Sequence, residues 1–204
     1  VKYIIGIDLG TTHCVLSYTE AQIDEQEEPD IFIFEISQIV APGEIKSQPL
    51  LPSFIFLPGE HDVPDGSLAL PWNSELDIAV GEFARQRGAE IPNRLVSSSK
   101  SWLCNSGVDR TKPVLPWESP PDTRRVSPVE ASSLLLNHIR DAWNHEIAAA
   151  DSESLLENQE IYLTVPASFD AVARELTVKA AESAGLKNLT LLEEPQAAFY
   201  SWIE

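Results

Sequence analysis

The chain has 204 residues, 43% of them hydrophobic, which is enough for one compact core or two small subdomains. Its 14 lysines and arginines stand against 32 aspartates and glutamates, so the formal net charge at pH 7 is −18. This charge repels phosphate backbones and anionic lipid, and we therefore expect no nucleic acid and no membrane among its partners.

The first elements predicted along the chain form an antiparallel meander. Two short apolar runs, at residues 2–9 and 14–18, are separated by a few residues around Gly10 and predict a β-hairpin. A third strand is expected at residues 31–36. It follows an acidic segment at residues 20–30, which we interpret as a solvated loop.

The composition changes after this meander. Prolines cluster in residues 42–71 and 113–128 and disfavour long regular elements, so we interpret residues 43–126 as an inserted α+β subdomain. Within it we expect one strand followed by two helices, at residues 52–57, 78–89 and 96–103.

A long helix is predicted to begin at Ser127. Ser127 and Glu130 have the spacing of a capping box, and Pro128 occupies the first helical position between them. Apolar residues then recur every four residues, as expected for a helix with one face on a sheet. These residues are Leu135, Ile139, Trp143 and Ile147.

Strands and helices alternate in the last part of the chain. Strands are expected at residues 160–165 and 189–192, separated by a helix that begins after Asp170 and ends at Gly185. A final helix follows near Pro195. Strands joined by crossover helices must lie parallel, so the sequence predicts a mixed five-stranded sheet, three antiparallel strands then parallel ones, flanked by helices.

This order of elements also predicts how the chain is divided. We expect residues 1–42 and 127–204 to form the sheet-based subdomain, with residues 43–126 inserted into it. The two cysteines, Cys14 and Cys104, lack the spacing of a zinc site or a disulfide framework, and a reducing cytoplasm suits them. Because the chain starts with valine, contains no methionine and stops within a predicted helix, we interpret it as a piece of a longer polypeptide.

A polar turn at the end of the first predicted strand has phosphate-binding chemistry. Gly10 lets the backbone approach a ligand closely, and the amides and hydroxyls of Thr11 and Thr12 supply donors for phosphate oxygens. Asp8 would repel a phosphate unless a cation lay between them, so we expect it to position a hydrated Mg²⁺. The turn matches neither GxxxxGK[ST] nor GxGxxG. The alternative is a hairpin turn whose Asp and Thr only satisfy backbone groups.

Three segments together resemble the DnaK-type seventy-kilodalton heat-shock chaperone family. They are IGIDLGTTH at residues 5–13, YLTVPASF at 162–169 and LLEEPQAAFY at 191–200. The resemblance covers nearly the whole chain and is weakest around residues 59–77 and 105–125. It implies the first lobe of a ribonuclease H-like, actin-type ATPase domain.

The resemblance also implies roles for the residues of the polar turn. Asp8 would order water around Mg²⁺, and Thr11 and Thr12, next to Gly10, would hold the β- and γ-phosphates of ATP together with the amide of His13. His13 departs from the aromatic residue usual at this position.

Two further residues would be catalytic by the same resemblance. Lys100 would reach from the insertion to the γ-phosphate, and Glu194, before Pro195, would orient water or a metal-bound water. The alternatives are an exposed helix lysine and an ordinary acidic residue at a helix N-terminus. Glu193 stands where the family commonly has asparagine, and Pro166 where a turn relays nucleotide state toward the substrate-binding domain.

The resemblance predicts a parent protein that hydrolyses ATP to ADP with Mg²⁺ to drive binding and release of unfolded peptides. Its partners would be a second ATPase lobe and a peptide-binding domain of the same chain, unfolded peptides and co-chaperones. Since the second lobe would supply the remaining nucleotide contacts, we expect the isolated chain to be inactive and prone to self-association. Three alternatives remain: an actin-like filament protein, a sugar or acid kinase, and a non-catalytic relative, which the departures at His13 and Glu193 keep open.

Overall fold

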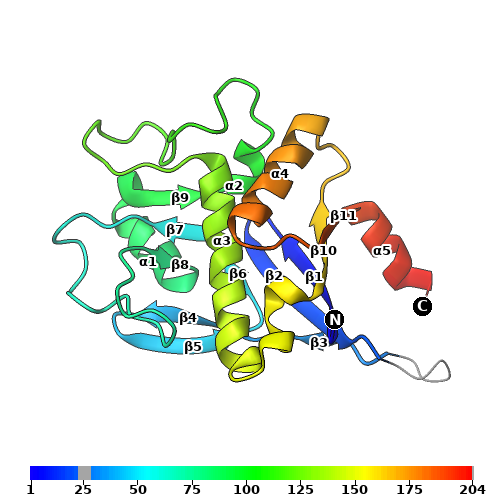
Figure 1. Cartoon of the computed structure of the whole chain (residues 1–204). Coiled ribbons are helices and arrows are strands. Elements are labelled where there is room, and N and C mark those ends of the chain that lie inside the picture. The colour runs from blue at the N-terminus through cyan, green and yellow to red at the C-terminus, as the bar shows by residue number, and fades with distance from the viewer. Residues whose placement is uncertain (23–28, 204) are drawn as a thin grey trace.

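The computed structural model describes residues 1–22 and 29–203 (Figure 1). Most of the acidic segment, residues 23–28, lies outside the described residues, so its interpretation as a loop stays a prediction. The described helices include none that is long and apolar enough to cross a bilayer.

A mixed sheet forms the base of the molecule, as predicted. Its strands are, in spatial order, β11 (Leu189–Glu193), β10 (Glu160–Val165), β1 (Tyr3–Leu9), β2 (His13–Glu20) and β3 (Phe32–Ile33). The β1–β2 and β2–β3 pairs are antiparallel, whereas β1–β10 and β10–β11 are parallel. A short sixth strand, β6 (Leu51–Pro52), also pairs with β2, so the part of the chain expected to be inserted extends the base sheet.

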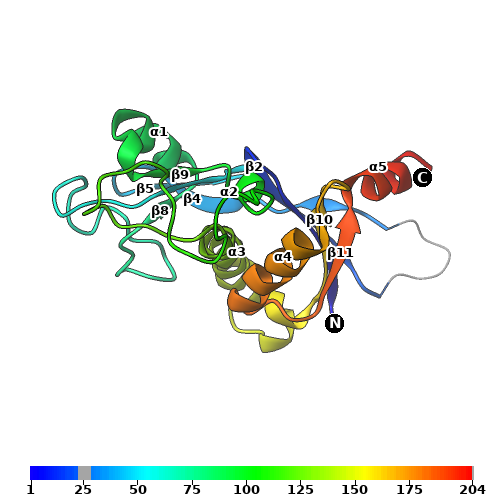
Figure 2. The same cartoon turned by 90° about the horizontal axis from the view of Figure 1, so that it is seen from above.

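Two long helices cover one face of this sheet. They are α3 (Pro128–Trp143), which continues into a π-helical turn at Asn144–Ala148, and α4 (Ala171–Ser183). Figure 2 shows them side by side, with α5 (Glu194–Ile203) on the other side of the sheet. The predicted caps are confirmed. The Ser127 and Glu130 side chains form a capping box, and Asp170 caps α4 by accepting a hydrogen bond from the Ala173 amide.

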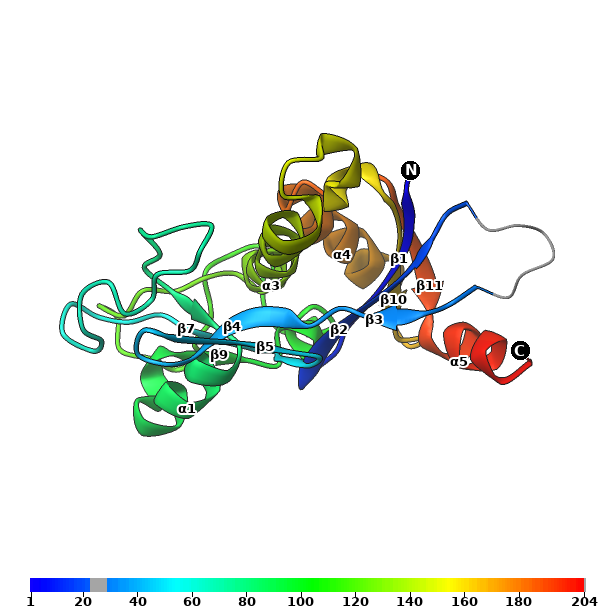
Figure 3. The same ribbon diagram turned by 90° about the horizontal axis from the view of Figure 1, so that it is seen from below.

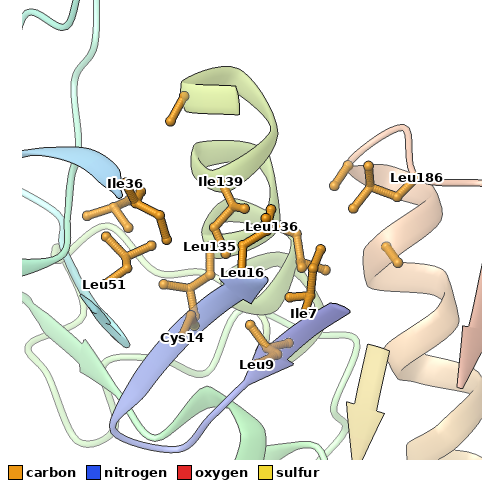
Figure 4. Packing of buried hydrophobic residues seen from close by; sticks show 14 of the residues in the cluster. Ile7, Leu9, Cys14, Leu16, Ile36, Leu51, Leu135, Leu136, Ile139 and Leu186 are labelled. Atoms are coloured by element: carbon orange, nitrogen blue, oxygen red, sulfur yellow. The ribbon is translucent and has the colours of Figure 1, made fainter. Parts of the chain in front are cut away.

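The main core lies between α3 and the sheet. In Figure 4, Leu135 and Ile139 of α3 point toward Ile7 of β1 and Leu16 of β2, and all four side chains are buried. Ile36 and Leu51 join the same cluster. Because strand side chains alternate between faces, burial of the neighbouring Ile7 and Leu9 turns Asp8 to the opposite face of the sheet.

Residues 36–126 contain more strand than predicted. Two small sheets are formed there by β4 (Ile36–Ala41) with β5 (Glu44–Gln48), and by β7 (Phe54–Phe56) between β8 (Ala79–Val80) and β9 (Leu95–Ser97). The helices of this region are α1 (Glu82–Glu90) and α2 (Ser99–Trp102). Figure 3 shows α1 and α3 on opposite sides of the β4–β5 pair.

Four predicted boundaries are therefore wrong. The expected strand at residues 31–36 ends at Ile33, because the chain leaves the base sheet and begins β4 at Ile36. The expected strand at residues 52–57 is divided between β6 and β7, which belong to different sheets. The two expected helices begin later than predicted, since residues 79–80 and 95–97 pair with β7 instead. Cross-strand pairing and burial in the small sheet outweigh local helix propensity there.

Candidate functional site

The polar turn between β1 and β2 is tightly braced from residues of the predicted insertion. Ser53 donates its hydroxyl to the Gly10 carbonyl (2.7 Å) and its amide to the Thr12 carbonyl (2.8 Å). A Cβ atom on Gly10 would lie 2.1 Å from the His13 carbonyl oxygen, so no other residue fits without moving the turn. The turn therefore has a fixed shape.

The donors of this turn remain available to a ligand. Thr11 and Thr12 are exposed, and their amides donate to no carbonyl or side chain within residues 1–22 and 29–203. Successive backbone amides without a partner, next to a glycine that lets a ligand approach closely, can donate hydrogen bonds to an anion such as phosphate. His13 is half-buried, and its Nδ1 lies 3.3 Å from the Thr12 hydroxyl.

Three charged residues predicted to act together do converge. The Lys100 Nζ lies 2.5 Å from Glu194 Oε1 and 3.8 Å from Asp8 Oδ1. The Lys100 side chain is only 7% exposed, whereas those of Asp8 and Glu194 are about half-exposed, at 53% and 43%. The alternative of an exposed helix lysine is therefore wrong. We call Asp8, Lys100 and Glu194 the charged cluster.

Each member of the charged cluster comes from a different element. Asp8 is in β1, Lys100 in the short helix α2, and Glu194 at the first position of α5, directly after β11. Ser98, just before α2, has a left-handed conformation with φ 55° and ψ 33°, which is uncommon for a residue other than glycine. This sharp turn from β9 into α2 directs the lysine toward β1.

One contact of the charged cluster was missed from the sequence. Thr164 of β10 donates its hydroxyl to Asp8 Oδ1 (2.9 Å) and so fixes the carboxylate. The parallel register places Thr164 directly beside Asp8, but that register is set by the fold and leaves no sequence signal. Ser53 was missed for the same reason.

The donor set fits a magnesium ion held partly by water and phosphate. Among the described residues, no three His, Cys, Asp or Glu side chains gather in a way that could hold a metal by themselves. Mg²⁺ commonly keeps several waters and binds through one or two carboxylates together with substrate phosphates. A single exposed carboxylate beside open backbone amides is compatible with that mode of binding, and Asp8 is the residue in position to provide it.

His138 and the two cysteines do not belong to the charged cluster. His138 is buried in α3, its Nε2 is 2.9 Å from the Ser37 carbonyl, and burial lowers its pKa to about 4. Cys14 packs beneath the polar turn, 3.3 Å from the Ser53 hydroxyl, and burial raises its pKa to about 12. Cys104 is exposed, and both thiols are free.

A sizeable cavity in the described part of the chain lies elsewhere. Its volume is about 640 Å³, and it is lined by Trp72 and His145 among others, at the end of α3. None of its lining residues belongs to the charged cluster or to the polar turn.

The mixed sheet with flanking helices is compatible with the first lobe of an actin-like ATPase. A scan of protein-family models finds no match to the chain. Curated relatives do match it, and they are chaperones of the DnaK type named HscA.

Three of these relatives cover almost the whole chain. The HscA homolog of Pseudoalteromonas atlantica is 31% identical over 209 residues, which is 97% of this chain and 28% of the relative. That of Methylococcus capsulatus is also 31% identical, over 207 residues and the same shares. HscA of Xenorhabdus nematophila is 30% identical over 198 residues, or 95% of this chain and 27% of the relative.

The resemblance to the DnaK-type chaperone family is thus confirmed over nearly the whole chain. The chain spans between a quarter and a third of the length of the curated relatives that it matches, 27–28% in these three.

Proposed function

We propose that this chain is the first lobe of the ATP-binding domain of a DnaK-like molecular chaperone. Residues 1–42 and 127–204 would form its ribonuclease H-like base, and residues 43–126 the inserted subdomain. The observation that carries the proposal is the convergence of Asp8, Lys100 and Glu194, from three separate elements, beside open amides at Thr11 and Thr12. Similarity to HscA chaperones over 97% of the chain supports it.

In this proposal the turn and the cluster divide the work of binding and hydrolysis. The amides of Thr11, Thr12 and His13 would donate hydrogen bonds to phosphate oxygens, and Gly10 allows the close approach. A bound magnesium ion would neutralise phosphate charge, and Asp8, oriented by Thr164, would hold its water shell. Lys100 would turn from Glu194 toward the terminal phosphate, which leaves the Glu194 carboxylate free to orient the attacking water.

The whole protein would use this chemistry to bind and release unfolded peptides. Its partners would be a second lobe and a peptide-binding domain of the same chain, together with co-chaperones. The turn after β10, at Pro166, is the candidate for passing the nucleotide state to the substrate-binding domain. The two free cysteines agree with a cytoplasmic location, which stays a prediction.

Steady-state ATP hydrolysis by the full-length protein, with and without an unfolded peptide, tests this function. We expect Mg²⁺-dependent hydrolysis that the peptide stimulates. Pelleting with ATP would instead favour a filament protein, and phosphate transfer to a sugar or an acid would favour a kinase. If ATP is neither bound nor hydrolysed, the chain is a non-catalytic relative.

The isolated chain should neither bind ATP tightly nor hydrolyse it. In this proposal the polar turn and the charged cluster would supply contacts to the phosphates. The contacts to adenosine would come from a second lobe. Calorimetric titration of the 204-residue chain with Mg²⁺ and ATP should therefore show no binding in the micromolar range. Low-micromolar affinity would contradict this division of the site.

Aromatic residues on α5 support the expectation of self-association by the isolated chain. Phe199, Tyr200 and Trp202 are 54%, 53% and 81% exposed, and their helix α5 lies on the side of the sheet opposite α3 and α4 (Figure 2). A patch of this kind favours association of isolated copies. Sedimentation should show dimers or larger species as concentration rises, and a strict monomer would contradict the expectation.

A further inference from the structure

Two neighbouring glutamates at the end of β11 have different partners. Glu194 Oε1 contacts Lys100, whereas Glu193 Oε1 accepts a hydrogen bond from the Arg174 Nη2 at 2.7 Å. Strand alternation explains the difference. Glu193 lies on the same face of β11 as Leu191, which packs into the core beneath α4. The additional carboxylate therefore lies on the α4 side of the sheet.

Arg174 is fixed at both ends of its guanidinium group. Its Nε donates to the Phe169 carbonyl (3.2 Å), in the turn that leads from β10 into α4, while Nη2 bonds Glu193. Its backbone lies in the first turn of α4, with the amide bonded to the Asp170 carbonyl (3.1 Å). Two side-chain bonds and a helical backbone leave little freedom for the pair, although both side chains are about one-third exposed, at 31% and 38%.

Glu193 is close enough to the charged cluster to influence it. Leu192, the residue before it, pairs with Thr164 of β10, and Thr164 in turn pairs with Asp8. Neighbouring strands are about 4.8 Å apart, so two strand spacings separate the backbones of β11 and β1 by about 10 Å. The formal charge of Asp8, Glu194 and Lys100 together is −1, and an uncompensated Glu193 would make it −2.

We propose that Arg174 is a positioning residue that retains and neutralises Glu193, so that the negative charge around a bound nucleotide's phosphates is not raised. The pair would let this chain carry glutamate where the resembling family commonly has asparagine. This inference rests on the proposed function, because the charge matters only if the charged cluster receives an anionic, magnesium-bound phosphate group.

Calorimetric titration of the full-length protein with Mg²⁺ and ATP tests the inference, using single and double variants. Arg174→Gln should weaken binding roughly three- to tenfold, because charged groups on strands whose backbones lie about 10 Å apart still interact near a protein surface. The loss should shrink at high ionic strength. Glu193→Gln should bind at least as tightly as the wild type, and the double variant should return to within about twofold of it.

A matched control separates local charge from general charge. Arg124 forms a comparable 2.7 Å ion pair with Asp77, in the region of residues 43–126, and Arg124→Gln should leave the affinity unchanged. Thermal unfolding of every variant measures any loss of stability. If lost stability alone weakened ATP binding in Arg174→Gln, removal of Glu193 would not restore the affinity.

The outcomes distinguish a failure of the role proposed for Arg174 from a failure of the proposed ATP-binding function. If the wild type binds ATP and Arg174→Gln binds equally well, Arg174 has no positioning role. If the double variant remains as weak as Arg174→Gln, the arginine acts through the Phe169 carbonyl and the charge argument is wrong. If the wild type binds no ATP, both the proposed function and this inference fail.

Discussion

Lys100 has the most constrained environment of the charged residues that carry the proposed chemistry. Its ammonium group is almost fully buried, yet it contacts two carboxylates, and a buried charge is tolerated only when it is paired in this way. In the proposed function, a nucleotide phosphate would replace Glu194 as the partner of this ammonium group.

Lys100→Met should abolish most ATP hydrolysis by the full-length protein. Methionine keeps the length of the side chain but removes the charge that would stabilise the transferred phosphoryl group, so we expect kcat to fall about 10²–10³-fold. Lys46→Met is the matched control, since Lys46 pairs with Glu44 on an exposed hairpin. Equal hydrolysis rates for wild type and Lys100→Met would exclude a catalytic role for this residue.

His138 should make the stability of the chain depend on pH. In the folded state burial lowers its pKa to about 4, whereas in the unfolded chain it takes up a proton near pH 6.5. The unfolded state therefore binds more protons between these values, and stability is lost as pH falls from about 6.5 to about 4, by up to about 3 kcal/mol. Urea unfolding of the wild type and His138→Gln at pH 7.5 and pH 4.5 measures this.

The variant should lose much of the pH dependence. His61→Gln, at an exposed position, serves as its control and should behave as the wild type does. If His138→Gln kept the full pH dependence, other groups would be responsible for it.

At the scale of elements, α3 is the helix that organises the molecule. It packs against the main sheet, against α4 and against the strands of residues 36–80, and its buried Trp143 donates to the Ser154 carbonyl (2.8 Å). Its N-terminus is fixed by reciprocal bonds between Ser127 and Glu130. A weakened cap should therefore lower the stability of the whole chain.

Ser127→Ala should destabilise the chain by about 1 kcal/mol, the usual value for loss of an N-cap side chain. For a domain of this size that corresponds to a fall in Tm of about 2–4 °C. Ser74→Ala, at an exposed serine outside any helix, should change Tm little. Equal Tm values for the two variants would mean that the capping box contributes nothing measurable.

The elements also show what the sequence could and could not predict. Strong local signals were sufficient for α3, for the Asp170 cap of α4 and for three strands of the base sheet, β1, β2 and β10. Residues 36–126 were predicted poorly, because their short strands of two to six residues are set by pairing with distant segments. Propensity over so few residues is easily overridden.

The candidate site followed the same division. Asp8 stands at a strand end that the local pattern marks, whereas the family resemblance supplied Lys100 and Glu194. Their convergence needed the fold, as did Thr164 and Ser53, whose contacts depend on register across the sheet. Nothing in the local pattern predicted that Arg174 would take up Glu193.

At the scale of the whole molecule, Asp8 of the charged cluster faces the side of the sheet opposite α3 and α4, which is the side where α5 lies (Figure 2). Exposed aromatic residues lie on that helix, and the chain spans 28% of the length of two of the relatives described above. In the proposed function, this side of the sheet would form one side of a nucleotide cleft.

The magnesium dependence of ATP binding by the full-length protein tests this account most directly. Calorimetric titration of the wild type and Asp8→Asn, with Mg²⁺ and with a chelator, compares how much the metal strengthens binding. We expect Mg²⁺ to strengthen ATP binding by the wild type. In Asp8→Asn the factor by which Mg²⁺ strengthens binding should be smaller by more than about tenfold, because asparagine keeps the shape of the side chain but not the charge that holds the metal's water shell. An equal gain from Mg²⁺ in both proteins would contradict the placement of the metal-bridged phosphates beside Asp8.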